Sequence, residues 1–155
     1  MSQNPDHAQV QIPPPLLMLI HLAATLVLDW LLPFPPIMPS LLRWLGVLLV
    51  LSGLFLAFMA ARQFLQAHTT LDPHSPVSAL VTVGPYRFSR NPIYLGFSLF
   101  LVGLPLALGT YWGLPMLLAF IPLMNRLVIQ HEETYLGRKF GEHYARYKVG
   151  ARRWL

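Results

Sequence analysis

Two arginines stand immediately before the start of a helix near the middle of the chain. Arg87 and Arg90 precede Asn91-Pro92, and Asn is a favoured N-cap residue while Pro is favoured at the first helical position. The free amides and partial positive charge of a helix N-terminus suit an anion, and an arginine suits bidentate contact with a carboxylate or phosphate. The pattern predicts an anion site here. The alternative is that both arginines only touch lipid phosphates.

A pair of glutamates, Glu132 and Glu133, follows the last long apolar run. If the helix continues, α-helical spacing puts these residues on two neighbouring stripes, one with Arg126, Gln130 and Glu133 and the other with Asn125, Ile129, Glu132 and Leu136. Ionisable groups near the hydrocarbon usually face a protein interior or an aqueous cavity, which makes the pair a functional candidate. A solvated pair just past the helix exit is the alternative.

Helices that cross a membrane must position these residues. Of the 155 residues, 55% are hydrophobic and only 11% are charged, whereas a soluble domain has about 25% charged residues. A transmembrane helix needs roughly 17–25 mostly apolar residues, and such runs occur at 16–32, 41–61, 92–108 and 112–129. We therefore expect an all-α membrane protein, a single domain over 1–155, with about four transmembrane helices in two hairpins. A disordered tail is expected at 1–15.

The basic residues gather in the two remaining segments, 62–91 and 130–155. The positive-inside rule then puts both segments and both termini in the cytoplasm. The net charge of +5 lies where anionic lipid headgroups require it, so we expect the bilayer, and no nucleic acid, as a partner. The chain has no cysteine, and its histidines follow no metal-ligand spacing, so no metal is expected.

The last segment carries a helical stripe of four apolar and aromatic residues, Leu136, Phe140, Tyr144 and Tyr147. Charged residues occupy most of the remaining surface, as in a helix that lies on a membrane. The stripe predicts a C-terminal amphipathic interfacial helix. A lid whose tyrosines stack on a ligand ring is the alternative.

Taken together, two motifs resemble one enzyme family. Gly84–Gly96 (GPYRFSRNPIYLG), a hydrophobic hairpin and His131–Trp154 (HEETYLGRKFGEHYARYKVGARRW) are similar to the isoprenylcysteine carboxyl methyltransferase and phospholipid N-methyltransferase superfamily. The resemblance covers roughly His68 to Trp154, and the upstream HTTLDPHSP resembles bacterial members. It implies a multi-pass methyltransferase of a bacterial cytoplasmic membrane that uses S-adenosylmethionine without a Rossmann domain.

The resemblance also implies the cofactor-binding residues. One wall of the pocket would consist of Tyr86, Arg87, Arg90, Asn91, Pro92, Tyr94 and Gly96, and the other of Glu132 and Glu133, with His68 as a further assignment from the preceding loop. Arg90 and Glu133 are the expected catalytic residues. A carboxylate suits the ammonium or ribose of the cofactor, and an arginine at a helix N-terminus suits the cofactor carboxylate or an acidic substrate.

The acceptor is expected to be a lipophilic small molecule or a lipid-linked group that enters between helices containing prolines. A carboxylate acceptor, as in the isoprenylcysteine enzymes, is already ionised near pH 7. A lipid amine must first lose a proton to Glu, His or water. Asn91 stands where eukaryotic carboxyl methyltransferases tend to have His, and both acceptors stay open. A non-catalytic membrane scaffold or subunit is the rival of another class, and a transporter is disfavoured because the polar residues cluster at one surface.

Overall fold

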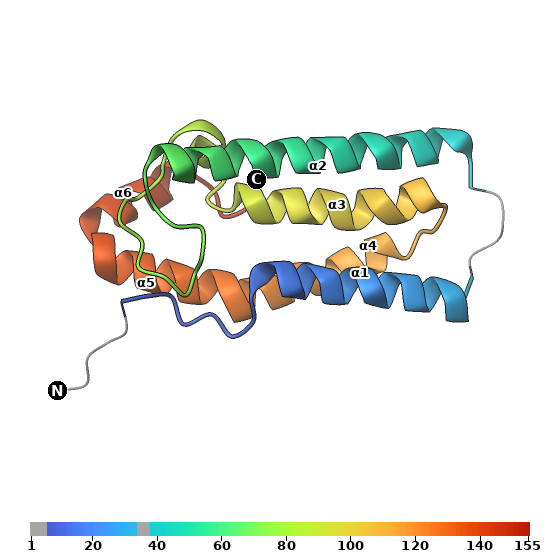
Figure 1. Ribbon diagram of the computed structural model, residues 1–155, viewed down its shortest axis with the longest axis horizontal. Helices are drawn as coiled ribbons and strands as arrows, with labels where there is room; N and C mark the ends of the chain where they lie inside the picture. The colour runs from blue at the N-terminus through green and yellow to red at the C-terminus, as the bar shows by residue number, and fades with distance from the viewer. Residues whose placement is uncertain (1–5, 34–37) are drawn as a thin grey trace.

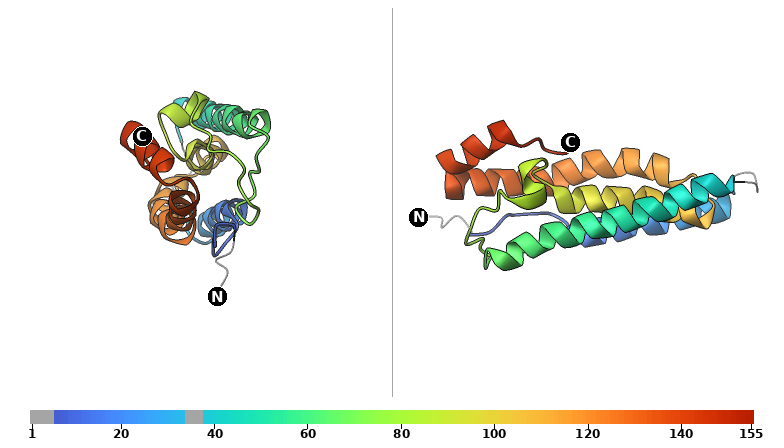
Figure 2. Two further views of the ribbon diagram at one scale, coloured as in Figure 1. Left: turned by 90° about the vertical axis from the view of Figure 1, so that its left-hand side faces the viewer. Right: turned by 90° about the horizontal axis from the view of Figure 1, so that it is seen from above.

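The computed structural model describes residues 6–33 and 38–155, and within these ranges the chain is helical. The helices are α1 (Pro14–Leu31), α2 (Ser40–Gln66), the 3-10 helix η1 (Gly84–Arg87), α3 (Pro92–Leu108), α4 (Gly113–Met124), the π-helix η2 (Asn125–Ile129), α5 (Gln130–Phe140) and α6 (Glu142–Gly150). The described ranges contain no strand beyond an isolated bridge between Ser89 and Arg152. The long helices run side by side along the long axis of the molecule (Figures 1 and 2). The predicted all-α class is confirmed.

The helices have the length and the surface of an integral membrane protein. In the described ranges, α1, α2 and the continuous helix Gly113–Phe140 are long and apolar enough to cross a bilayer, and α3 is a shorter apolar helix. Large apolar side chains on the outside are exposed, with Leu41 at 78%, Phe55 at 67% and Leu118 at 75%. Such a surface suits lipid rather than water. The run predicted at 92–108 coincides with α3, while α2 extends beyond the predicted end at residue 61.

The helix Gly113–Phe140 is too long to lie wholly within the hydrocarbon. Its 28 residues extend about 42 Å at 1.5 Å per residue, against a hydrocarbon core of about 30 Å. Its polar end is α5, which carries Glu132, Glu133, Arg138 and Lys139. We therefore place α5 beyond the membrane-spanning part, which consists of α4 and η2.

Glycines bring α2 and α3 into close contact. Gly46 and Gly53 on α2 face Gly103 and Gly96 on α3, respectively. A Cβ atom on Gly53 would lie 2.6 Å from the Gly96 carbonyl oxygen, and one on Gly96 would lie 2.7 Å from the Gly53 carbonyl oxygen. Small residues let membrane helices approach this closely. The contact fixes the start of α3, where the predicted site residues lie, against α2.

α3 also lies between α1 and α2, which run antiparallel, as the hairpin arrangement requires (Figure 1). α2 packs on α3, whereas α1 packs on α3 and α4. The core formed by α1, α3 and α4 includes Leu101, Phe120 and Met124, all fully buried. Part of the connection between α1 and α2, residues 34–37, lies outside the described residues.

The segment 1–15 was expected to be a disordered tail, and its described part packs against the rest of the molecule. α1 already begins at Pro14, and Ala8 and Val10 are buried. The Ala8 amide donates to the Pro73 carbonyl at 3.1 Å, and Lys139 Nζ donates to Asp6 Oδ1 at 2.7 Å. Apolar burial and these long-range contacts hold a segment that has no helical or strand pattern of its own. Residues 1–5 of the predicted tail lie outside the described residues.

Candidate active site

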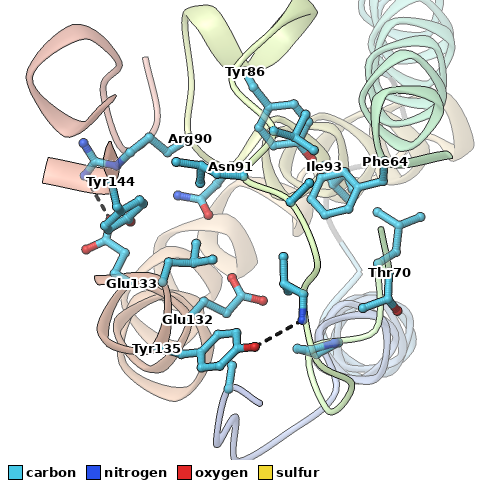
Figure 3. Close-up of a pocket in the computed structure, with 18 of the residues that line it drawn as sticks. Phe64, Thr70, Tyr86, Arg90, Asn91, Ile93, Glu132, Glu133, Tyr135 and Tyr144 are labelled. Atoms are coloured by element: carbon cyan, nitrogen blue, oxygen red, sulfur yellow. Dashed lines mark hydrogen bonds and ion pairs between the residues drawn. The ribbon is translucent and has the colours of Figure 1, made fainter. Parts of the chain in front are cut away.

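A cavity of about 120 Å³ (Figure 3) lies at the end of the bundle where α2 ends, α3 begins and α5 and α6 meet; Figure 1 shows this end of the bundle. Its walls come from α2, α3, α5, α6, the loop 70–81 and the N-terminal segment. Glu132 and Tyr135 project from α5 toward it, and Phe64, Tyr86 and Ile93 lie across from them (Figure 3). Segments far apart in the sequence therefore share one cavity.

The start of α3 is held by the C-terminal segment. Asn91 and Pro92 occupy the N-cap and first helical positions as predicted, but the Asn91 side chain makes no capping hydrogen bond. Its Nδ2 donates to the Arg153 carbonyl at 2.9 Å. The Arg90 amide donates to the Arg152 carbonyl at 2.8 Å, and the Arg152 amide donates to the Phe88 carbonyl at 3.3 Å. Backbone pairing thus sets the position of Arg90 and Asn91.

Glu133 is held by two arginines. Arg90 Nη2 donates to its Oε1 at 2.9 Å, and Arg153 donates through Nε to Oε1 at 3.1 Å and through Nη2 to Oε2 at 2.6 Å. Burial opposes ionisation of Glu133, but the hydrogen bonds and charges of Arg153 and Arg90 outweigh it and lower its pKa. Glu133 is therefore an ionised carboxylate, and both of its oxygens already accept hydrogen bonds from this cluster.

Glu132 differs from its neighbour because no arginine contacts it among the hydrogen bonds and ion pairs of the described residues. Its Oε1 accepts a hydrogen bond of 2.6 Å from the Tyr94 hydroxyl. Burial raises the pKa of Glu132 from about 4.5 to about 7, and the Tyr94 hydrogen bond offsets this only in part. Glu132 thus supplies the cavity with a carboxylate that has acceptor capacity left and whose charge changes near neutral pH.

One nitrogen of the Arg90 guanidinium lacks a hydrogen-bond partner among the described residues. Its Nη1 donates to the Ala151 carbonyl at 2.7 Å and its Nη2 to Glu133, but its buried Nε has no hydrogen-bond partner among the described residues. A buried N–H without an acceptor is costly. Because Arg90 lines the cavity, this donor fits a site that binds an anionic or acceptor group.

Aromatic side chains form much of the remaining wall. Tyr86, Tyr144 and Tyr147 line the cavity with Phe64, and the Tyr147 hydroxyl donates to the Tyr86 carbonyl at 2.7 Å. The predicted single C-terminal amphipathic helix is broken at Gly141, whose φ of +50° suits glycine. This turn directs α6 back over the cavity, so its tyrosines face the site.

A second cavity, of about 620 Å³, adjoins the first. It is mostly apolar and is lined by Pro13–Pro15 of the N-terminal segment and α1, Ala57, Phe58 and Ala61 of α2, Ile93, Tyr94 and Phe97 of α3, and Leu71–His74 of the loop. Leu71, Asp72, Pro73, Ile93 and Tyr94 line both cavities. We call the first the polar cavity and the second the apolar cavity.

Hydrogen bonds of Tyr135 hold the outer wall of the polar cavity in place. Its hydroxyl accepts hydrogen bonds from the Val77 amide at 3.1 Å and from Lys139 Nζ at 3.0 Å (Figure 3 shows the Val77 bond). The same hydroxyl donates to the Asp6 carbonyl at 3.1 Å. Ala8, next in this segment, lines the cavity. One side chain therefore joins α5 to both the loop and the N-terminal segment.

The structure brings together six of the ten residues predicted to bind the cofactor. The polar cavity is lined by Tyr86, Arg90, Asn91, Tyr94, Glu132 and Glu133. The other four lie outside its lining: His68 and Arg87 are exposed, Pro92 is buried in the first turn of α3, and Gly96 packs against α2.

The stripe predicted for Arg126, Gln130 and Glu133 does not hold, whereas Glu132 and Leu136 of the neighbouring stripe both line the cavity. The π-helix η2, Asn125–Ile129, interrupts α-helical spacing, so Arg126 is exposed while Glu133 lines the cavity. Arg153 and Tyr135 were not predicted as site residues. Nothing near Arg153 in the sequence marks it as a site residue, since its contacts come from distant segments. For Tyr135 the only sequence signal is its position between Glu132 and Leu136.

Comparisons with known proteins identify the family. A family model described as phospholipid methyltransferase matches residues 41–143. The chain belongs to the phospholipid methyltransferase family. The match includes α2 to α5, and thus both Arg90 and the glutamate pair, but not α1 or Arg153. The family places the chain among membrane methyltransferases, as the sequence motifs predict.

Part of the chain is also similar to a curated relative. An uncharacterized protein from Haemophilus influenzae is 43% identical over 63 residues, which is 41% of this chain and 100% of the relative. No solved structure matches the chain.

Proposed function

We propose that this protein transfers a methyl group from S-adenosylmethionine to a lipophilic acceptor that reaches the site from the bilayer. The observation that carries the proposal is the pair of adjoining cavities with a shared wall at Leu71–Pro73, Ile93 and Tyr94. The polar one offers Arg90, Glu132 and Glu133 to a charged, water-soluble cofactor, and its volume of about 120 Å³ requires it to widen when such a molecule binds. The apolar one, at about 620 Å³, falls within the roughly 300–1,000 Å³ of small-molecule sites.

The donors and acceptors of the polar cavity fit S-adenosylmethionine. Glu132 would accept from the cofactor ammonium or ribose hydroxyls, and Arg90 Nε would donate to its carboxylate. Phe64 and Tyr86 would contact the adenine ring. When bound, S-adenosylmethionine supplies a methyl group on a sulfonium sulfur that leaves as a neutral thioether.

Glu133 and Arg90 have different parts in this proposal. Because Glu133 already accepts from two arginines, it holds Arg90 in place, and we assign direct contact with the cofactor to Glu132. Arg90 remains a contact residue, since its Nε is free to donate. The chain's own contribution to rate is then orientation of the two reactants and exclusion of water from a narrow site.

The apolar cavity favours an amine over a carboxylate acceptor. Its described lining contains no Lys or Arg, and its titratable residues are Asp72, His74 and Tyr94. A carboxylate would find no cation there, whereas an ammonium would find Asp72. We therefore propose the lipid-amine alternative, with the acceptor's apolar tail in this cavity and its head at the shared wall. We further propose that the polar cavity and both termini lie on the cytoplasmic side of a bacterial membrane, as the positive-inside rule indicates.

Calorimetric titration of S-adenosylmethionine and S-adenosylhomocysteine into the detergent-purified full chain tests the proposal. We expect micromolar-range binding by the parent protein. E132Q and R90A should each raise Kd by about 10-fold or more, because a charge-assisted hydrogen bond contributes about 1.5–3 kcal/mol. E142Q and R62A change exposed residues that line neither cavity and should bind like the parent.

Failure to bind has a clear meaning. If well-folded parent protein binds neither ligand, in detergent or in lipid nanodiscs, the methyltransferase proposal is wrong and a non-catalytic membrane scaffold is favoured. If E132Q and E142Q bind alike, the assignment of Glu132 is wrong, while the cofactor stands.

A further inference from the structure

The wall between the two cavities carries a pair of side chains that the cofactor site does not use. Asp72 lines both cavities and His74 lines the apolar one. Tyr94, the other titratable residue of that lining, is hydrogen-bonded to Glu132. Within the described lining of the apolar cavity, the His74 imidazole is thus the group with a ring nitrogen that can take a proton from a bound molecule, and the Asp72 carboxylate lies beside it.

The contacts between Asp72 and His74 fix the orientation of the imidazole. Asp72 Oδ1 accepts from the His74 backbone amide at 3.0 Å and lies 3.3 Å from His74 Nδ1. Its Oδ2 accepts from the Ser75 hydroxyl at 2.8 Å. An ionised carboxylate only accepts hydrogen bonds, so His74 Nδ1 must carry the hydrogen. In the neutral ring, Nε2 is then a proton acceptor.

Asp72 stays ionised in this arrangement. The hydrogen bonds from the His74 amide and the Ser75 hydroxyl lower the pKa of its carboxyl below the usual value. The side chains of His74 and Asp72 are 45% and 54% exposed, so a proton taken up here can pass to water. His7 is the other titratable ring nearby, with its centroid 6.5 Å from that of His74.

An amine acceptor needs such a group. An alkyl ammonium, with a pKa near that of lysine at about 10.4, has no lone pair with which to attack a methyl group at neutral pH. We propose that His74, oriented by Asp72, is the base that removes this proton. The inference rests on the proposed function and adds a catalytic residue to it.

The step balances as a simple proton transfer. One N–H bond of the acceptor ammonium breaks, and its electron pair stays on nitrogen as the lone pair that attacks the methyl group. A new N–H bond forms at His74 Nε2, which gives an imidazolium stabilised by Asp72. The imidazolium then returns its proton to water.

Two acceptor probes isolate the role of the base. Dodecylamine is protonated at pH 7.5 and needs deprotonation, whereas 4-dodecylaniline is already neutral there and does not. Transfer of radiolabelled methyl from S-adenosylmethionine to each probe is measured with the full chain in detergent. The variants are H74Q, D72N and H143Q, and the last removes an exposed histidine on α6 as a matched control.

We expect H74Q to lower kcat for dodecylamine by about 100-fold, the lower end of general-base effects, because water can reach the site. D72N should lower it by about 10-fold. With 4-dodecylaniline, both variants should stay within about twofold of the parent, and H143Q should match the parent with both probes.

Three results would overturn the inference. Equal losses with both probes would mean that His74 supports structure only, and no loss with either would mean that it is idle. If the parent methylates neither probe, the apolar cavity does not deliver an amine to the cofactor. Calorimetric binding of S-adenosylmethionine in the same preparation then separates the outcomes, because retained binding leaves the proposed cofactor function standing.

Discussion

The reciprocal contact between Gly53 and Gly96 predicts a specific pattern of stability in alanine variants. A Cβ on Gly53 would lie 2.6 Å from the Gly96 carbonyl oxygen, whereas ordinary contact begins at 3.4 Å. The helices must therefore separate locally by about 0.8 Å, and overpacking of this kind costs about 1–3 kcal/mol. Alanine regains up to about 1 kcal/mol of helix propensity. G53A and G96A should each be destabilised by a net of about 0–2 kcal/mol relative to the parent, and by about 1–3 kcal/mol relative to an alanine variant of a helical glycine that has room for a Cβ.

The double variant carries the sharper test. Because each Cβ meets the carbonyl of the other glycine, one separation of α2 from α3 makes room for both. G53A/G96A should therefore cost clearly less than the sum of the single changes. Gly137 on α5 is the matched control: a Cβ there would have its nearest neighbour, Tyr144 Cδ1, at 3.9 Å. G137A should be neutral or more stable.

Unfolding by SDS in mixed micelles, followed by tryptophan fluorescence, measures these differences. The reasoning is refuted if G53A and G96A are as stable as G137A. The reasoning is also refuted if the loss of stability in the double variant equals the sum of the losses in the two single variants, because the two glycines would then act independently.

Three further predictions concern the polar cavity. Since the pKa of Glu132 is raised to about 7, its ionised fraction rises about 10-fold from pH 6 to pH 8. The affinity for S-adenosylmethionine, measured by calorimetry, should rise by a similar factor over this range. E132Q should abolish this pH dependence of the affinity. R153A removes the fork on Glu133 and should weaken binding about 10-fold, with no rescue by R153K because lysine cannot form the fork; unchanged Kd for R153A would contradict this. Y135F removes the bonds to Val77 and Asp6 and should speed dissociation of S-adenosylhomocysteine about 5–10-fold in stopped-flow; an unchanged rate would show that this wall does not limit exit.

The sequence was sufficient to place the long apolar helices, though not η2 or the break at Gly141, because apolar runs and helix-start chemistry are local signals. The run 92–108 gave the bounds of α3, since Asn91-Pro92 marks a start and Gly109, with φ of +102°, permits the stop. The motif resemblance likewise predicted that Arg90 and Glu132 share a pocket, which they do.

The remaining contacts depend on distance in space and not on neighbours in sequence. Nothing near Arg153 indicates that it reaches Glu133, and nothing near Ala8 indicates that it lies under the loop at Pro73. For Gly96 the local signal is present but the predicted position in the pocket is not. It stands within the motif, yet its role in the structure is close packing against Gly53.

The π-helix η2 makes the site tolerant of one change in the length of the chain. The five residues Asn125–Ile129 complete about the same turn as four residues of an α-helix, since π-helical hydrogen bonds run from i to i+5. Deleting one residue there would let the helix relax to α geometry and would leave Glu132 and Glu133 on nearly the same face. In a regular α-helix the same deletion would turn everything after it by about 100° and would rotate both glutamates away from the cavity. A one-residue deletion in η2 should therefore preserve both insertion into the bilayer and assembly of the site.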